Sequence, residues 1–266
     1  MPQHLALNTI TIKQEADLKR KIEVAAAAGF TGIGLWSSEL TDHENAGGEL
    51  SQVRGWLDEA GLVVPEMCFV GGWMFVDDQQ KQTALAQCRR QFQQARAVGC
   101  GCVIACASGA EGPLDEAAAD YAELCDAAAD YDVVPALEFL AGAQTVRTLT
   151  SAAEVVARAD RPNGGILLDT FHFIVGGSQL RDIAEAGKMV AMVHINDCPG
   201  KPDRTDADRV HAGDGDFPLR EMLDLLGEVG YEGFLSLELF NPGYWAQPAA
   251  GVAREGCDKL RNLVSA

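Results

Sequence analysis

The sequence lacks two features that mark whole classes of protein, long apolar runs and clusters of positive charge. No stretch approaches the roughly 18 consecutive apolar residues of a membrane-spanning helix, so we expect none. Lys and Arg number 21 against 39 Asp and Glu, a formal net charge of -18. The longest basic run, Lys19-Arg20-Lys21, falls on one expected helix. Because proteins that bind nucleic acids or anionic membranes need a basic surface, we expect neither partner.

Cysteine pairs with the spacing of metal or redox motifs are also missing. None of the eight cysteines belongs to a Cys-x-x-Cys pair, and Cys100 and Cys102 have a spacing that fits no known zinc motif. We therefore expect small buried thiols in a reducing compartment. The first residues show no basic region followed by an apolar run, so we expect no signal peptide and a cytoplasmic protein.

The sequence does contain a regular alternation of short apolar runs with longer, Ala-rich amphipathic segments. The runs predict strands at residues 5–10, 32–36, 62–68, 102–107, 133–139, 165–169, 189–196 and 234–239. The segments between them predict helices at residues 15–28, 49–60, 79–98, 115–131, 147–159, 178–186, 218–229 and 246–264. Short apolar strands that alternate with helices are typical of a parallel sheet covered by helices.

Glycines close several of these helices before the next strand begins. Each suits a left-handed helix end: Gly29, Gly61, Gly99 and Gly230. Eight such units in 266 residues predict one (β/α)8 TIM barrel, a single domain over residues 1–266. An open doubly wound sheet is the alternative, but residues 8–11 are not its glycine-rich phosphate loop. The one long irregular stretch, residues 197–218, is a candidate functional loop.

Polar side chains interrupt the apolar strands at the ends where such barrels keep their active sites. They are Glu138, Asp169, His194 and Glu238, and none of these four strands contains a Lys or Arg. Since converging carboxylates repel one another, a divalent cation is the favoured explanation, with a purely structural polar cluster as the alternative. Three carboxylates and one imidazole favour Mn²⁺, while Mg²⁺, Co²⁺ and Zn²⁺ are also compatible.

Five ordered motifs cover the second half of the chain. They are A-L-E-F at 136–139, L-L-D-T-F-H-F at 167–173, V-H-I-N-D at 193–197, D-R-V-x-x-G-x-G at 208–215 and S-L-E-L-F-N-P-x-Y-W at 236–245. The set resembles the sugar phosphate isomerase/epimerase family of xylose-isomerase-like barrels, and within it the 2-keto-myo-inositol (inosose) isomerases most closely. Two departures concern the substrate: Ala212 replaces a family proline, and the first 75 residues show no close resemblance.

The resemblance implies that the four polar side chains bind the metal and that Glu138 and Glu238 also serve as the acid/base pair. It further implies that His172 and Arg209 contact the substrate. A metal that chelates a carbonyl and a neighbouring hydroxyl stabilises the enediolate formed when a proton leaves the adjacent carbon. We therefore expect an isomerase or epimerase of a keto-sugar or keto-cyclitol. A lyase on the same scaffold, either a dehydratase or an enzyme that cleaves keto-glycosides or C-glycosides, is the alternative.

Further side chains near strand ends are candidates for shaping the substrate site. Trp36 and Trp73 can stack on a sugar ring, although such rings also serve as core filler. Asn8 can donate to a substrate hydroxyl. A nuclease like the AP endonucleases is a remote alternative, because such enzymes use more histidines and a basic groove. A non-catalytic binding barrel is disfavoured by the two glutamates, and a homodimer is a modest expectation.

Overall fold

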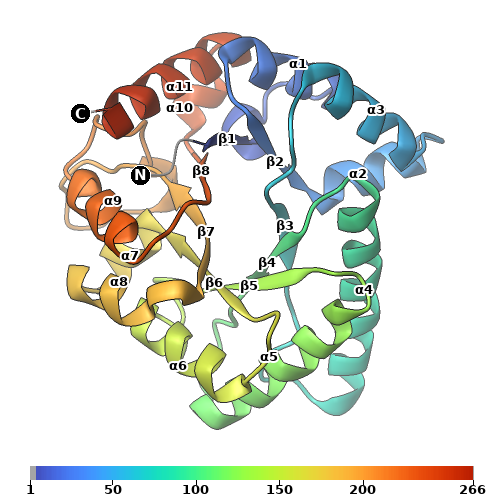
Figure 1. Cartoon of the computed structure of the whole chain (residues 1–266), viewed down its shortest axis with the longest axis vertical. Helices are drawn as coiled ribbons and strands as arrows, with labels where there is room; N and C mark the ends of the chain where they lie inside the picture. The colour runs from blue at the N-terminus through green and yellow to red at the C-terminus, as the bar shows by residue number, and fades with distance from the viewer. Residues whose placement is uncertain (1–3, 266) are drawn as a thin grey trace.

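A computed structural model, which describes residues 4–265, forms a closed barrel of eight parallel strands (Figure 1). Each strand pairs with its neighbour in the sequence, and the first pairs with the last, His4 lying opposite Phe234. The strands are β1 (His4–Asn8), β2 (Gly32–Trp36), β3 (Met67–Val70), β4 (Cys102–Cys106), β5 (Val134–Glu138), β6 (Gly165–Asp169), β7 (Val190–Ile195) and β8 (Phe234–Leu237). The predicted (β/α)8 barrel is confirmed, and the open sheet is excluded.

The third strand differs from its expected range of 62–68. Residues 62–66 approach β2 only through a bridge between Val63 and Gly32, and the ladder starts at Met67. Pro65 lies in this approach and has no N–H to donate to a ladder. The strand therefore begins later than its apolar pattern suggests.

Helices surround the barrel on its outer face. They are α1 (Leu18–Ala28), α2 (Ser37–Asn45), α3 (Leu50–Ala60), α4 (Asp78–Ala97), α5 (Leu114–Ala129), α6 (Leu149–Ala159), α7 (Thr170–Gly176), α8 (Leu180–Ala186), α9 (Leu219–Glu228), α10 (Pro242–Trp245) and α11 (Ala249–Ser265). Three short 3-10 helices accompany them: η1 (Thr9–Ile12), η2 (Gly187–Met189) and η3 (Asp206–Asp208). No helix among residues 4–265 has both the length and the apolarity needed to cross a membrane.

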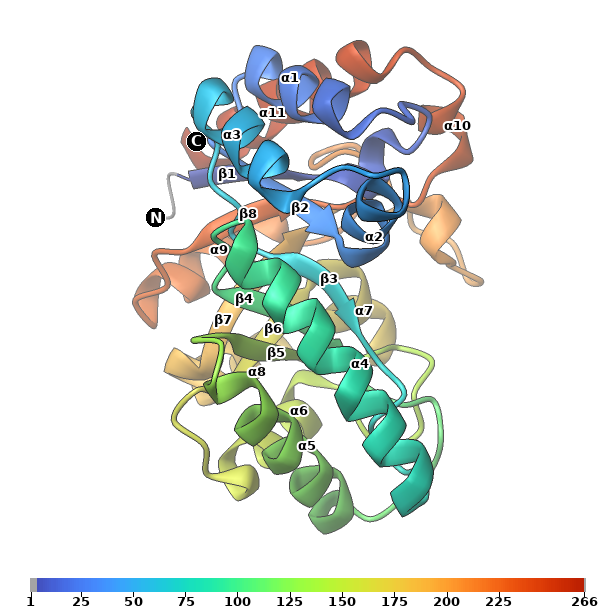
Figure 2. The ribbon, with the colours of Figure 1, turned by 90° about the vertical axis from the view of Figure 1, so that its right-hand side faces the viewer.

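Three of these helices were not expected from the sequence, namely α2, α7 and α10. Figure 2 shows them together at the end of the barrel toward which the strands point. Helix α7 starts because Asp169 caps it, accepting hydrogen bonds from the backbone nitrogens of Phe171 at 2.7 Å and His172 at 3.1 Å. The predicted glycine stops are confirmed, since Gly29 and Gly61 end α1 and α3 with φ of 95° and 67°.

The core has two parts. Most buried apolar side chains lie between strands and helices, whereas a small cluster packs separately. That cluster comprises Cys68, Ile104, Ala136, Leu167 and Met192. The expectation of buried cysteines holds for six of the eight, while Cys102 and Cys106 are partly exposed. Because the small cluster draws on β3 to β7, it is a rigid base for the side chains at the strand ends.

Candidate functional site

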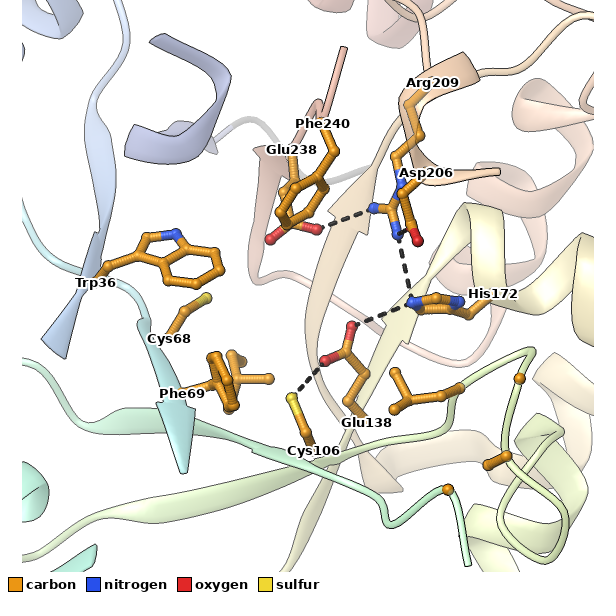
Figure 3. Close-up of a pocket in the computed structure, with 15 residues that line it drawn as sticks. Trp36, Cys68, Phe69, Cys106, Glu138, His172, Asp206, Arg209, Glu238 and Phe240 are labelled. Carbon is orange, nitrogen blue, oxygen red and sulfur yellow. Dashed lines mark hydrogen bonds and ion pairs between the residues drawn. The ribbon is translucent and has the colours of Figure 1, made fainter. Parts of the chain in front are cut away.

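A cavity of about 400 Å³ opens among the residues at the carboxyl ends of the strands. Its polar side is made by Glu138, His172, Arg209 and Glu238, which point toward one another in Figure 3. Each is mostly buried, and they come from four different strand ends or loops. The barrel thus brings together residues that are up to a hundred positions apart in the chain.

Glu138, the last residue of β5, is 7% exposed and holds two close contacts. The Cys106 thiol donates to its Oε2 at 3.2 Å, and His172 Nε2 lies 3.9 Å from its Oε1. Burial, followed by the charge of Glu238, raises the pKa of Glu138 to about 8. A carboxyl group with that pKa can both carry and release a proton near neutral pH.

Arg209 is a buried cation that the strand sequences did not reveal. Its Nη1 donates to Asp169 Oδ2 at 2.7 Å and to Glu238 Oε2 at 2.9 Å, and the side chain is 1% exposed. Burial alone would raise the pKa of Asp169, but the guanidinium, His172 and His194 together outweigh it, and the pKa falls to about 2. The premise that the carboxylates have no cationic partner is therefore wrong, because the partner arrives from the loop after β7 rather than from a strand.

The two ring nitrogens of His194 face different side chains: Nδ1 faces Glu238 and Asp169, and Nε2 faces Glu66. Its Nδ1 lies 3.3 Å from Glu238 Oε2 and 3.8 Å from Asp169 Oδ2, yet it makes no hydrogen bond within the described chain. Burial would lower the pKa of the imidazole, but Glu238 and Glu66 raise it well above its usual value. The space beside Nδ1 thus attracts positive charge, from a proton or from a metal ion.

The expected ligand set suits a divalent ion in this arrangement. Ligand atoms of Glu138, Asp169 and His194 lie within 4.8 Å of one another, and Glu238 faces the same His194 nitrogen. Mixed carboxylate and imidazole donors match the preferences of several divalent ions. The structure therefore contains a candidate metal site, and the ligand roles of the four residues remain predictions.

Glu66 is a further buried carboxylate beside His194, and the sequence did not lead us to expect it there. Its Oε2 lies 2.5 Å from His194 Nε2, and the side chain is fully buried. The signal was present, since Glu66 interrupts an apolar run just as the four expected residues do. It was missed because the strand was expected to end at Cys68, so that Glu66 was not placed at a strand end.

Two expected substrate contacts lie away from the cavity surface. Trp73 is fully buried and packs against Tyr121 with ring centroids 6.0 Å apart, so it belongs to the core. Asn8 is also fully buried, where it accepts a hydrogen bond from Trp36 Nε1 at 2.8 Å and donates to Glu238 Oε1 at 3.3 Å. Neither residue is retained as a substrate contact, and Asn8 positions two residues that do line the cavity.

Aromatic rings line another part of the cavity, which we call the aromatic wall and define as Trp36, Phe69 and Phe240. The Trp36 ring meets Phe69 and Phe240 edge-on, with centroids 5.7 Å and 6.1 Å away (Figure 3). Phe69 remains 42% exposed. Flat apolar surfaces of this kind pack against the faces of ring-shaped ligands. Trp36 thus lies where the sequence placed it, whereas Phe240 was not expected.

Comparison with known proteins relates the chain to a family of TIM barrels and to enzymes. A family model described as "Xylose isomerase-like TIM barrel" matches residues 22–263. An inosose isomerase of Halalkalibacterium halodurans is 38% identical over 54% of the chain and 52% of its own length. A 3-dehydroshikimate dehydratase of Pseudomonas aeruginosa is 30% identical over 96% of the chain, which spans 40% of that protein. The chain thus covers about half or less of either relative.

A crystal structure described as the IolI protein with a bound zinc atom shares the whole fold. It has a TM-score of 0.92 and 25% identity, and the match covers 99% of this chain and 98% of that one. A fold that superposes over its full length preserves the positions of strand ends, where barrels of this type carry their sites.

Proposed function

Since the chain belongs to the xylose isomerase-like TIM barrel family, as its motifs predict, we propose that it is a metal-dependent isomerase or epimerase. The observation that carries the proposal is the convergence of Glu138 and Glu238 on one cavity beside Asp169 and His194. The substrate class is a keto-cyclitol such as an inosose, or a related keto-sugar. The reaction removes a proton from the carbon next to a carbonyl and returns a proton to the same carbon or to the neighbouring one.

The residues divide the chemistry between them. Glu138, Asp169, His194 and Glu238 would hold a divalent ion, which when bound supplies positive charge to an enediolate oxygen. Glu238, paired with Arg209 at 2.9 Å, accepts the proton from carbon. Glu138 returns a proton to the substrate as the general acid. Return to the same carbon inverts its configuration, whereas return to the neighbouring carbon moves the carbonyl.

The cavity favours an uncharged ring. Of the described residues that line it, Arg209 is the one Lys or Arg, and its nitrogens already contact Asp169, Glu238 and Asp206. Among the described lining residues, no Lys or Arg is therefore left to pair with a phosphate or carboxylate group of the substrate. The aromatic wall offers the apolar surface that a six-membered ring with axial hydrogens can cover.

Elimination is the second candidate, because the same intermediate loses a β-hydroxyl if one is well placed. It is favoured by the alignment of a dehydratase over 96% of this chain. However, 3-dehydroshikimate is an acid, and the described residues that line the cavity include no Lys or Arg free to pair with its carboxylate. The isomerase assignment therefore comes first. Mn²⁺ remains our first choice of ion, with Zn²⁺ next, and a cytoplasmic homodimer completes the proposal.

Incubation of the Mn²⁺-loaded protein with 2-keto-myo-inositol in D₂O tests the proposal. An isomerase or epimerase gives an isomer with deuterium on carbon, whereas a dehydratase gives a product that has lost water, and NMR and mass spectrometry separate the two. Glu138→Gln and Glu238→Gln should each abolish the exchange, while Glu228→Gln, on the exposed face of α9, should not. Turnover that survives both active-site changes would falsify the acid/base assignment.

A further inference from the structure

Glu66 directly precedes β3, and the hydrogen bonds of its carboxylate are made with buried side chains. His194 Nε2 lies 2.5 Å from Oε2, while Ser236 Oγ donates to Oε1 at 2.6 Å and Asn8 Nδ2 donates to Oε1 at 3.2 Å. The side chain is fully buried. Both oxygens are therefore engaged, and the partners come from β1, β7 and β8.

The barrel keeps space for this carboxylate at Gly34 on β2. A Cβ at Gly34 would overlap Glu66 Oε1 and would lie 3.0 Å from its Cγ. The φ of Gly34 is not in the left-handed region, so the backbone does not require a glycine there. The absence of a side chain at this position is explained by the volume that Glu66 occupies.

We propose that Glu66 is a positioning residue that fixes the orientation of His194 and makes Nδ1 its metal-binding nitrogen. A carboxylate accepts hydrogen bonds only, so the proton of the imidazole that faces Glu66 must lie on Nε2. The opposite tautomer would direct a nitrogen lone pair at a carboxylate oxygen 2.5 Å away, which is repulsive. Nδ1 is then the nitrogen that faces Glu238 and Asp169 without a hydrogen-bond partner.

The inference rests on the metal-dependent function proposed above and deepens it. Histidine ligands commonly donate their second N–H to a carboxylate, which orients the ring and increases its basicity. Loss of such a partner typically weakens metal binding by about 10–100-fold. The ring of His194 is 1% exposed, and Glu66 is the carboxylate that contacts its Nε2. The Cys68 thiol lies near both side chains but carries no carboxylate charge, so it cannot fully replace Glu66.

The test is Zn²⁺ affinity, measured by titration against a competing chelator without any substrate. Glu66→Ala should weaken Zn²⁺ binding by about 10–100-fold. Glu66→Gln should recover part of the loss, because its amide oxygen can still accept from Nε2. In ¹⁵N-histidine NMR of the Zn²⁺-loaded protein, His194 should show a protonated Nε2 in the wild type and lose that slowly exchanging proton in Glu66→Ala.

Asp120→Asn is the matched control, because Asp120 is a buried carboxylate that contacts Phe75 N at 2.8 Å and Lys81, not His194. It should lower stability and leave Zn²⁺ affinity unchanged. The inference is overturned if Glu66→Ala binds Zn²⁺ as tightly as the wild type, if Asp120→Asn weakens binding equally, or if the wild type binds no Zn²⁺. Should Glu66→Ala fail to fold, Glu66→Gln and the NMR signal of the wild type decide the question.

The outcomes also separate this inference from the proposed function. If the wild type does not turn over keto-cyclitols while Glu66→Ala still weakens Zn²⁺ binding, the substrate assignment fails and the role of Glu66 stands. If the wild type turns over keto-cyclitols and the Zn²⁺ affinity of Glu66→Ala is unchanged, the substrate assignment stands and the role of Glu66 fails.

Discussion

The two sides of the cavity differ in charge, in burial and in where they lie along the chain. The acidic wall, which we define as Glu138 and Glu238 at the cavity together with Asp169 and His194 next to them, comes from the ends of β5 to β8 and is at most 7% exposed. Two of the three residues of the aromatic wall, Trp36 and Phe69, come from the first half of the chain, whereas Phe240 follows β8, and Phe69 is 42% exposed. A buried, charged wall suits the making and breaking of bonds. Residues of a wall that is open to solvent can differ between enzymes with different substrates without loss of that chemistry.

Removal of the metal should produce the largest difference between the two walls. Proton transfer at the acidic wall is expected to require a divalent ion, whereas packing of the substrate on the aromatic wall requires none. Dialysis against a chelator should therefore reduce isomerisation below detection, and Mn²⁺ should restore it. Calorimetry of the chelated protein should still show a folded barrel. Full activity after complete removal of metal, checked by elemental analysis, would contradict the comparison.

Substitution of the proton-transfer residues should have the next largest effect. Glu238→Gln keeps the size of the side chain but removes the group that accepts a proton, so kcat should fall by about 10²–10⁴-fold. KM should change much less, because the aromatic wall is untouched. A steady-state comparison with Glu228→Gln gives the baseline. A variant that loses affinity instead of kcat would show that Glu238 binds the substrate rather than reacting with it.

The acidic wall should also make the free energy of unfolding of the metal-free protein decrease as the pH rises. Because the pKa of Glu138 rises from 4.5 to about 8, folded protein holds a proton that the unfolded chain has lost. The free energy of unfolding should therefore decrease between about pH 4.5 and 8, by a few kcal/mol. Asp169, whose pKa is lowered to about 2, acts below pH 4 and outside this window.

Urea unfolding of the chelated wild type and of Glu138→Gln at several pH values tests this effect. The variant should lose the decrease between about pH 4.5 and 6.5, where Glu138 acts without His194, and be the more stable protein at pH 8. The raised pKa of His194 keeps part of the decrease above about pH 6.5 in both proteins. Equal slopes for both proteins would mean that Glu138 is not the group responsible.

Much of the acidic wall, but little of the aromatic wall, could be predicted from the sequence. A lone Glu or His in an apolar strand is visible because burial of a charge needs a reason, and the order of strands places the four together. Arg209 was assigned to the substrate by resemblance, but its pairing with Asp169 depends on the path of a loop. Phe69 lies on β3 and lines the cavity, whereas Trp73 lies in the loop after β3 and is core. The alternation of the strand stops at Val70, so it does not predict which way Trp73 faces.

The smallest expected effect sharpens the role of the aromatic wall. Phe69 meets Trp36 edge-on and is 42% exposed at the cavity, so it is available to pack on one face of a ring. Phe69→Ala should raise KM for a keto-cyclitol by about tenfold, which corresponds to roughly 1.4 kcal/mol of lost packing, with kcat nearly unchanged. For an open-chain ketose such as erythrulose, KM should change little, because such a substrate presents no flat face.

Val63→Ala is the control for Phe69→Ala, since Val63 is an apolar side chain that is 49% exposed but does not line the cavity. Its KM values should equal those of the wild type for both substrates. If Phe69→Ala lowers kcat for both substrates equally, the aromatic side chain supports the acidic wall rather than selecting the substrate. The acidic wall and the aromatic wall would then not have separate roles at this position, because Phe69 would affect both catalysis and substrate selection.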